Sequence, residues 1–252
     1  MSLKTFGLEV AAWNGWADSP RQFGVILGIT GAFAAFAYLL RGVSRSGAIA
    51  GAVVCFALFA GAGPGGFAAL LSLFVVTWLA TRFGLASKQI RGTAERGDGR
   101  SASQVFANIG VAATCALLYA VHRHPQVLLA LSAALAEPAA DTVSSECGQA
   151  FSEKAILITT FEEVQGGTNG GITLTGTLSG LIAAVLISLV GVRFELLAAG
   201  QWWIPTAAGV VGMVADSYLG ALVERRGWLG NDWVNFIGTL VAAIAAVGLG
   251  RL

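Results

Sequence analysis

Long apolar runs recur along the whole chain and constrain its fold more than any other feature. They lie at approximately residues 23–40, 47–63, 66–82, 104–121, 126–140, 172–190, 204–222 and 234–250. The sequence of 252 residues is 56% hydrophobic and only 12% charged, about half the charged fraction of an average soluble domain. Backbone amides in lipid must pair within helices or a closed barrel, and continuous apolar runs are typical of helices. We therefore predict an all-α transmembrane bundle of about eight spans, forming one membrane domain over residues 1–252.

Several of these runs are shorter than the ~20 residues that cross a bilayer as a helix. We therefore expect one or two spans to be short or broken, and the run at 126–140 most of all. Residues 1–22 carry Trp13 and Trp16 and are predicted to lie at the membrane interface, because indole rings favour the headgroup level.

Small residues at GxxxG spacing recur at 24–28, 47–51 and 176–180. This spacing lets two helix backbones approach closely in lipid. We interpret it as packing within the bundle, with a homodimer interface as the alternative. The net charge of +1 gives no indication of a nucleic-acid partner, and we expect none.

The basic residues predict the orientation in the membrane. If the N-terminus faces outward, one side of the membrane receives the loops around 41–46, 83–103, 141–171 and 223–233. These loops together with Arg82 hold ten of the fifteen Lys and Arg residues. Cytoplasmic loops carry an excess of basic residues. We therefore expect this side to be cytoplasmic, in a membrane of the bacterial inner (plasma) membrane type.

Acidic and hydroxyl side chains follow the apolar run at 126–140. Asp141 and Glu146 bracket three hydroxyl residues, and Pro138 is expected to kink or restart the helix just before them. Glu137 and Asp141 would share a face if the segment stayed helical. Hard oxygen ligands near a membrane surface suit Mg²⁺, which uses one or two carboxylates and completes its shell with water and phosphate oxygens. The alternative interpretation is a solvated helix end.

A glycine-rich turn, GGTNGGIT, occupies residues 166–173. We expect it to lead into a helix N-terminus, where exposed N–H groups and the helix dipole favour phosphate. Thr168 and Asn169 would add side-chain donors, although an ordinary glycine-rich connector is the alternative. GAGPGG at 61–66 also satisfies GxGxxG, but it follows no strand, and we interpret it as a tight interhelical turn.

One carboxylate lies inside an apolar run. Asp216 is expected within a span, where an ionised Asp costs about 2.5–3.5 kcal/mol on insertion scales. Such a residue normally faces the bundle interior, so we favour a metal or substrate role over a structural Arg partner. Asn231 and Asn235 open the last helix, and Asn231 suits an N-cap.

Basic and amide residues occupy the loop that leads into the fourth span. Arg100 belongs to a mobile basic loop that fits a polyphosphate ligand, although positive-inside topology explains the charge equally well. Gln104 and Asn108 enter the span at helical spacing.

These motifs, taken in order, resemble the DUF92/TMEM19 family of integral membrane proteins over about residues 80–240. The resemblance rests on GDGRSASQVFAN, ADTVSSECG, GGTNGGITLTG and VADSYLGALVE followed by NDWVNF. That family includes the plant phytyl-phosphate kinase of tocopherol synthesis. The resemblance implies that the chain phosphorylates a prenyl monophosphate to the diphosphate, with CTP or another nucleoside triphosphate as donor. Glu224 stands where Gln is common in the family.

The mechanism that we expect from the motifs and the resemblance places Mg²⁺ on Asp141, Glu146 and Asp216. Arg100 or Lys88 would neutralise developing charge. The expected nucleotide and phosphate contacts are Gly167, Thr168, Asn169, Gly170, Gly171, Lys88, Gln104, Asn108, Ser217, Asn231 and Asn235.

Two other classes of membrane protein are consistent with the same residues. The first is a secondary transporter of a small anion or lipid-linked substrate, since carriers also use broken helices and intramembrane carboxylates. The second is a lipid-head cytidylyltransferase or phosphotransferase. The polar groups gather on one side and we detect no internal repeat, and both observations favour an enzyme over a carrier. The expected partners are a nucleoside triphosphate, an isoprenoid lipid phosphate and membrane lipids.

Overall fold

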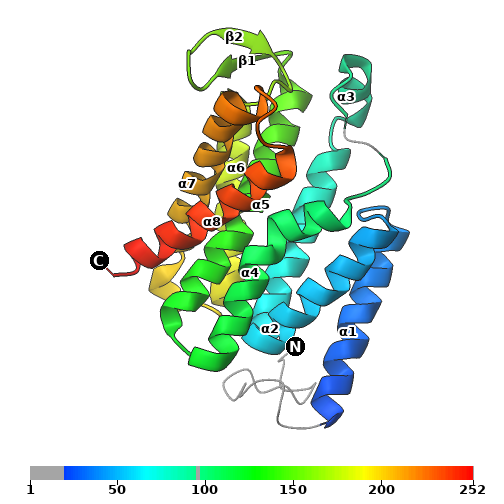
Figure 1. The fold of residues 1–252 in the computed structure, drawn as a ribbon, viewed down its shortest axis with the longest axis vertical. Coiled ribbons are helices and arrows are strands. Elements are labelled where there is room, and N and C mark those ends of the chain that lie inside the picture. The colour runs from blue at the N-terminus through cyan, green and yellow to red at the C-terminus, as the bar shows by residue number, and fades with distance from the viewer. Residues whose placement is uncertain (1–19, 95–96, 252) are drawn as a thin grey trace.

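The computed structural model describes residues 20–94 and 97–251 and shows a helical bundle with a small sheet at one end (Figure 1). The predicted interfacial residues Trp13 and Trp16 lie outside the described residues. The long helices are α1 (Pro20–Leu39), α2 (Arg45–Arg82), α4 (Ala102–His122), α5 (Pro125–Phe151), α6 (Leu174–Arg193), α7 (Trp203–Leu219) and α8 (Asn231–Leu249). The shorter elements are α3 (Leu85–Arg91), the 3₁₀ turn η3 (Ala199–Gln201), the π-helical turn η4 (Gly220–Glu224), and strands β1 (Lys154–Leu157), β2 (Glu163–Gln165) and β3 (Gly171–Ile172).

Seven helices in the described part are long and apolar enough to cross a membrane, by length and composition. The predicted eight spans differ from these seven because α2 contains two of them. Gly63 has non-helical φ and ψ angles of 71° and −163°, and Pro64 follows it. The indole of Trp78 and the guanidinium of Arg82, in the second half of α2, both donate to the carbonyl of Leu40, at 3.2 and 2.7 Å. The two halves therefore run antiparallel, and the prediction of an interhelical turn at 61–66 is confirmed.

Helix α5 is the centre of the bundle and contacts α2, α4, α6, α7 and α8. Every residue from 129 to 140 is buried. The helix continues through Pro138 to Phe151, so the predicted span at 126–140 ends too early and the predicted loop at 141–171 begins too early. Helix α6 approaches this part closely, since a Cβ at Gly180 would lie 2.7 Å from the carbonyl oxygen of Ala140. The polar end of α5 stays helical because neighbouring helices cover it.

Polar elements gather at one end of the bundle. Figure 1 places α3, the strands, the start of α4, the end of α5 and the turn between α7 and α8 at the same end. The predicted loop at 141–171 contains an antiparallel sheet in the order β2-β1-β3, with Ala155 opposite Val164 and Ile156 opposite Ile172. Helix α3 lies within the other predicted loop, 83–103. The prediction that the polar motifs share one side of the bundle is confirmed.

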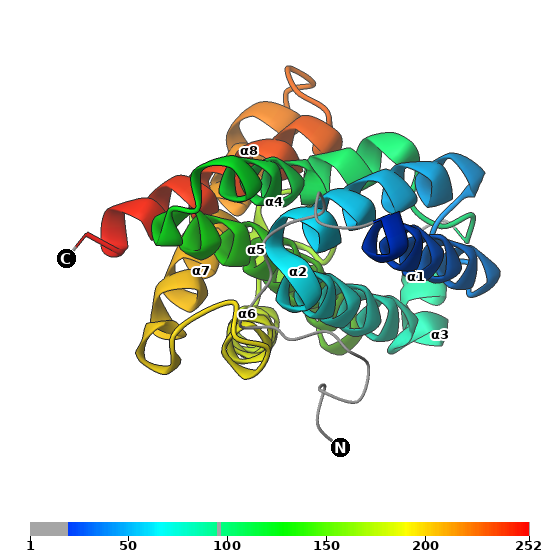
Figure 2. The same ribbon diagram turned by 90° about the horizontal axis from the view of Figure 1, so that it is seen from below.

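Helix α1 lies at the edge of the bundle against α2 (Figure 2). Its Phe23 packs edge-to-face on Phe56 of the first half of α2. Its Phe33 packs in the same way on Phe67 and Phe74 of the second half. Helix α1 therefore contacts both halves of the α2 hairpin.

Candidate functional site

Four acidic side chains from three elements form a cluster at the polar end of the bundle. Glu137 and Asp141 come from α5, Asp216 from α7 and Glu224 from η4. Glu137 interacts electrostatically with Asp141 and Asp216, and the latter two each interact with Glu224. The structure therefore brings Asp141 and Asp216 together, as the sequence predicts. It adds Glu137 and Glu224, which the sequence analysis did not propose as site residues.

Two carboxyl oxygens of this cluster are buried without a hydrogen-bond partner among the described residues, namely Glu137 Oε1 and Asp216 Oδ2. Glu137 is only 1% exposed. Both oxygens face Gly238 of α8, because a Cβ there would lie 2.7 Å from Glu137 Oε1 and 3.4 Å from Asp216 Oδ2. Acidic groups without a partner inside a membrane span are costly and are typical of functional sites.

The glycine-rich turn packs against η4 and so joins the cluster. Asn169 forms a side-chain hydrogen bond with Glu224. Gly170 has a φ of 77°, and a Cβ there would lie 2.7 Å from the backbone nitrogen of Ala221. Only glycine adopts this conformation readily and leaves room for such contact. The turn thus holds Asn169 beside the acids.

The glycine-rich segment 166–173 leads into α6, as predicted, because Thr173 is the N-cap and the helix begins at Leu174. Within this segment, residues 171 and 172 pair with β1 as β3. The hydroxyl of Thr173 caps α6 by accepting from the N–H of Gly176 at 3.0 Å. Gly167 and Gly170 in this turn have positive φ angles, which glycine adopts readily.

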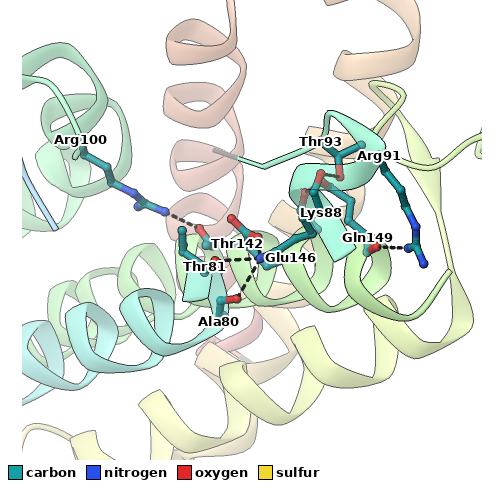
Figure 3. A network of polar contacts seen from close by, with 10 residues as sticks. Ala80, Thr81, Lys88, Arg91, Thr93, Arg100, Thr142, Glu146 and Gln149 are labelled. Atoms are coloured by element: carbon teal, nitrogen blue, oxygen red, sulfur yellow. Dashed lines mark hydrogen bonds and ion pairs between the residues drawn. The ribbon is translucent and has the colours of Figure 1, made fainter. Parts of the chain in front are cut away.

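Arg100 brings a positive charge to the acids. Its Nη2 donates to Thr142 Oγ1 at 3.0 Å, as Figure 3 shows, and its guanidinium interacts electrostatically with Asp141. The backbone of Arg100 is fixed by two hydrogen bonds to the segment before α2, from its N–H to Gly42 and from Ser44 to its carbonyl. Arg100 therefore lies where the prediction expects it, next to Asp141.

Lys88 and Glu146 form a separate buried ion pair. The Lys88 ammonium group is fully buried and donates to Glu146, to the Thr81 carbonyl at 2.8 Å and to the Ala80 carbonyl at 3.3 Å (Figure 3). An ammonium group has three donors, so these acceptors use all of them. Lys88 ties α3 to the end of α2 and to α5, and the structure gives it no donor for a phosphate.

Glu146 accordingly does not join the acid cluster. It lies five residues beyond Asp141, which places it on a different face of α5. It is one helical turn beyond Thr142, and its partner Lys88 lies in α3 and contacts the end of α2. Across residues 20–94 and 97–251, no three His, Cys, Asp or Glu side chains are arranged to hold a metal ion by themselves. The predicted three-carboxylate metal site of Asp141, Glu146 and Asp216 is therefore not assembled in this structure.

Two predicted phosphate contacts, Gln104 and Asn108, form hydrogen bonds in the first turns of α4. The Gln104 side chain accepts from the Ser101 N–H at 2.8 Å, and the Ser101 hydroxyl accepts from the Gln104 N–H at 3.4 Å. This reciprocal arrangement is a capping box. The buried Asn108 amide donates to the Gln104 carbonyl at 2.8 Å. These contacts orient the helix that follows Arg100.

Three further predicted residues lie in α7 and α8. The Ser217 hydroxyl donates to the carbonyl of Met213 one turn earlier. Asn231 is the first residue of α8, and Gly230 occupies the N-cap position, so the predicted cap is wrong by one residue. Asn235 is half-buried one turn further along α8.

Comparison with known proteins gives one family and several relatives. The chain matches the family described as integral membrane protein DUF92 over residues 28–243. It is 36% identical to an uncharacterized membrane protein of Methanocaldococcus jannaschii over 211 residues, which are 82% of this chain and 85% of the relative. It is 30% identical to Protein VTE6, chloroplastic, of Arabidopsis thaliana over 218 residues, 83% of this chain and 66% of the relative. Protein PGR of the same plant is 29% identical over 262 residues, 92% and 91% of the two chains. No solved structure matches the chain.

Proposed function

The chain belongs to the DUF92 family of integral membrane proteins, and on that basis we propose that it transfers a phosphoryl group from a nucleoside triphosphate, preferably CTP, to an isoprenoid monophosphate. The product is the isoprenoid diphosphate. The similarity to Protein VTE6, together with the resemblance of the motifs to a family that includes the plant phytyl-phosphate kinase, supports this class of activity. We place the reaction at the cytoplasmic face of the plasma membrane, because the polar end carries the excess of basic residues.

The observation that carries the proposal is the convergence of separate motifs at one end of the bundle. Asp141 and Asp216 interact across α5 and α7. Arg100 approaches the same place from the start of α4, and Asn169 approaches it through its hydrogen bond with Glu224. Carboxylates, a guanidinium group and a glycine turn together suit a phosphate ligand and its counter-ion.

The residues present fit a divalent cation that arrives with the nucleotide. The unpartnered oxygens of Glu137 and Asp216 and the nearby carboxylate of Asp141 are hard oxygen donors. Mg²⁺ commonly binds proteins through only one or two carboxylates and completes its shell with water and phosphate oxygens. We propose that Asp141 and Asp216 hold it, with Glu137 behind them. When bound, the ion would neutralise charge on the transferred phosphate.

The residues of the chain would act mainly by alignment and charge stabilisation. An oxygen of the acceptor phosphate forms a bond to the terminal phosphorus of the nucleotide, and the bond from that phosphorus to its bridging oxygen breaks. The nucleoside diphosphate leaves. The acceptor is already anionic, so no general base is required. Arg100 would neutralise negative charge that develops on the transferred group, and backbone N–H groups of the glycine turn would orient the nucleotide phosphates.

The test uses purified protein in lipid nanodiscs with geranylgeranyl monophosphate, Mg²⁺ and either CTP or ATP. We expect the wild-type protein to form the diphosphate. Asp141→Asn and Asp216→Asn should lower kcat by at least ~100-fold, the usual effect of removing one group that stabilises transition-state charge. Glu137→Gln should also lower kcat. Glu195→Gln is its matched control, because Glu195 is an exposed residue in the turn after α6, at the opposite end of the bundle.

The same preparation distinguishes the other classes. A secondary transporter is favoured by one observation, the buried pair of Glu137 and Asp216 inside the spans. It would move a phosphate ester into liposomes without consuming nucleotide. A cytidylyltransferase would release pyrophosphate from CTP and leave a cytidylyl lipid. Either result, with no diphosphate formed by the wild-type protein, would exclude the proposed kinase.

A further inference from the structure

A cavity of about 300 Å³ lies between α1, both halves of α2, the segment around residues 97–100 and the first turns of α4. Its volume is at the lower end of the ~300–1,000 Å³ of small-molecule sites. The interior is lined largely by apolar side chains, among them Phe33, Val54, Leu73 and Ile109. This lining suits a hydrocarbon chain rather than a nucleotide.

The rim of the cavity is basic. Arg41, Arg82 and Arg100 all line it. Arg82 stacks over the ring of Trp78 at 3.9 Å. Arg41 is exposed and has a φ of 55°, a conformation that non-glycine residues adopt rarely. An apolar interior below three guanidinium groups is complementary to an amphiphile with one hydrocarbon chain and an anionic head, because guanidinium groups bind phosphate strongly.

Arg100 connects this cavity to the acid cluster. It lines the cavity and also donates to Thr142, whose neighbour in the chain is Asp141. Figure 3 shows the Arg100 side chain reaching toward α5. The head group of a chain bound in the cavity would therefore lie beside the proposed phosphoryl-transfer site.

We infer that this cavity binds the hydrocarbon chain of the isoprenoid phosphate acceptor, with the acceptor phosphate at Arg41 and Arg100. The inference rests on the proposed function for the identity of the acceptor. Gly51 offers a direct probe, because it lines the cavity and a Cβ built there meets no atom within 4 Å. A larger side chain at this position would occupy the cavity and shorten the chain that fits.

The experiment compares Gly51→Leu with Gly110→Leu. Gly110, in α4, also has open space around a built Cβ, but it does not line the cavity. Each variant is photolabelled with geranyl and geranylgeranyl monophosphates that carry a diazirine at the far end of the chain. Labelled peptides are identified by mass spectrometry. In the wild-type protein we expect labels on cavity residues of α1, α2 and α4.

Gly51→Leu should reduce geranylgeranyl labelling by at least about tenfold. Hydrophobic pockets discriminate by about this factor or more between ligands that differ by a single methylene group. Geranyl labelling should fall much less, and Gly110→Leu should label as the wild-type protein does. Arg41→Gln supplies a second variant. It should reduce the preference for geranylgeranyl monophosphate over the neutral alcohol in competition with the probe.

The outcomes separate this inference from the proposed function. Labels outside the cavity, equal labelling of the two leucine variants, or full competition by phosphatidylcholine would overturn the inference, even if the wild-type protein forms diphosphate. Cavity labels that depend on Gly51 and Arg41 would support an amphiphilic phosphate site even if no diphosphate is formed. In that case the proposed kinase activity fails and the binding site stands.

Discussion

Replacing Lys88 by methionine tests whether this residue holds the fold together or contacts phosphate. Its ammonium group is fully buried, and the side chain of its partner Glu146 is only 9% exposed. Removing one charge of a buried pair leaves the other without compensation and costs about 3–5 kcal/mol. Lys88→Met also leaves the carbonyls of Ala80 and Thr81 without their donor. We expect the free energy of unfolding to fall by about 3–5 kcal/mol.

The assay is unfolding in mixed detergent micelles, followed by circular dichroism. The double variant Lys88→Met with Glu146→Met should recover most of the loss, because apolar pairs often replace buried ion pairs at little cost. Lys154→Met is the matched control. Lys154 pairs with Glu163 at 2.6 Å, but their side chains are 70% and 58% exposed. An exposed pair contributes at most ~1 kcal/mol.

Kinetic measurements on Lys88→Met distinguish a structural role of Lys88 from a contact with phosphate. If Lys88→Met keeps the stability of the wild-type protein but raises the KM for nucleotide, Lys88 contacts phosphate. The double variant would then be no more active than the single one. A structural pair predicts the reverse, with stability and activity falling together and both recovering in the double variant.

Two further predictions concern glycine and capping positions. Gly170→Ala should lower both thermal stability and diphosphate formation, because its Cβ would meet Ala221 in addition to the left-handed strain. Gly92 has a similar φ of 71°, but a Cβ built there meets no atom within 4 Å. Gly92→Ala should therefore lower the free energy of unfolding by only about 1–2 kcal/mol and leave activity unchanged. Ser101→Ala removes the acceptor for the Gln104 N–H and should cost about 1 kcal/mol of stability, measured by the same melting experiment.

The spans could be predicted from the sequence because lipid imposes them. An apolar run of near-spanning length must pair its own amides, so helix type follows from composition alone. The break between residues 61 and 66 was also predictable, since Gly63 and Pro64 together end a helix. Counting the predicted membrane crossings then placed the polar motifs on the same side of the bundle.

The residue at which α5 ends could not be predicted from the sequence in the same way. Pro138 and the acids after it indicate a helix end in any local reading, whereas neighbouring helices keep this segment helical to Phe151. Because the predicted span ended at residue 140, Glu137 was not proposed as a site residue, although its spacing from Asp141 places both on one face of the continuous helix α5. Lys88 was expected in an exposed basic loop, and its burial depends on how α3 docks on α5. Such features depend on tertiary contacts, and no short sequence window contains them.

The bend at Gly63 has a consequence for how the protein enters its membrane. A continuous helix over the 38 residues of α2 would measure about 57 Å at ~1.5 Å per residue, nearly twice the ~30 Å of hydrocarbon that a bilayer offers. As a hairpin, the segment inserts as a pair and returns the chain to the side it left. Straightening this one position would invert every later helix, and Arg100 would be separated by the full bilayer from the loop that begins α2.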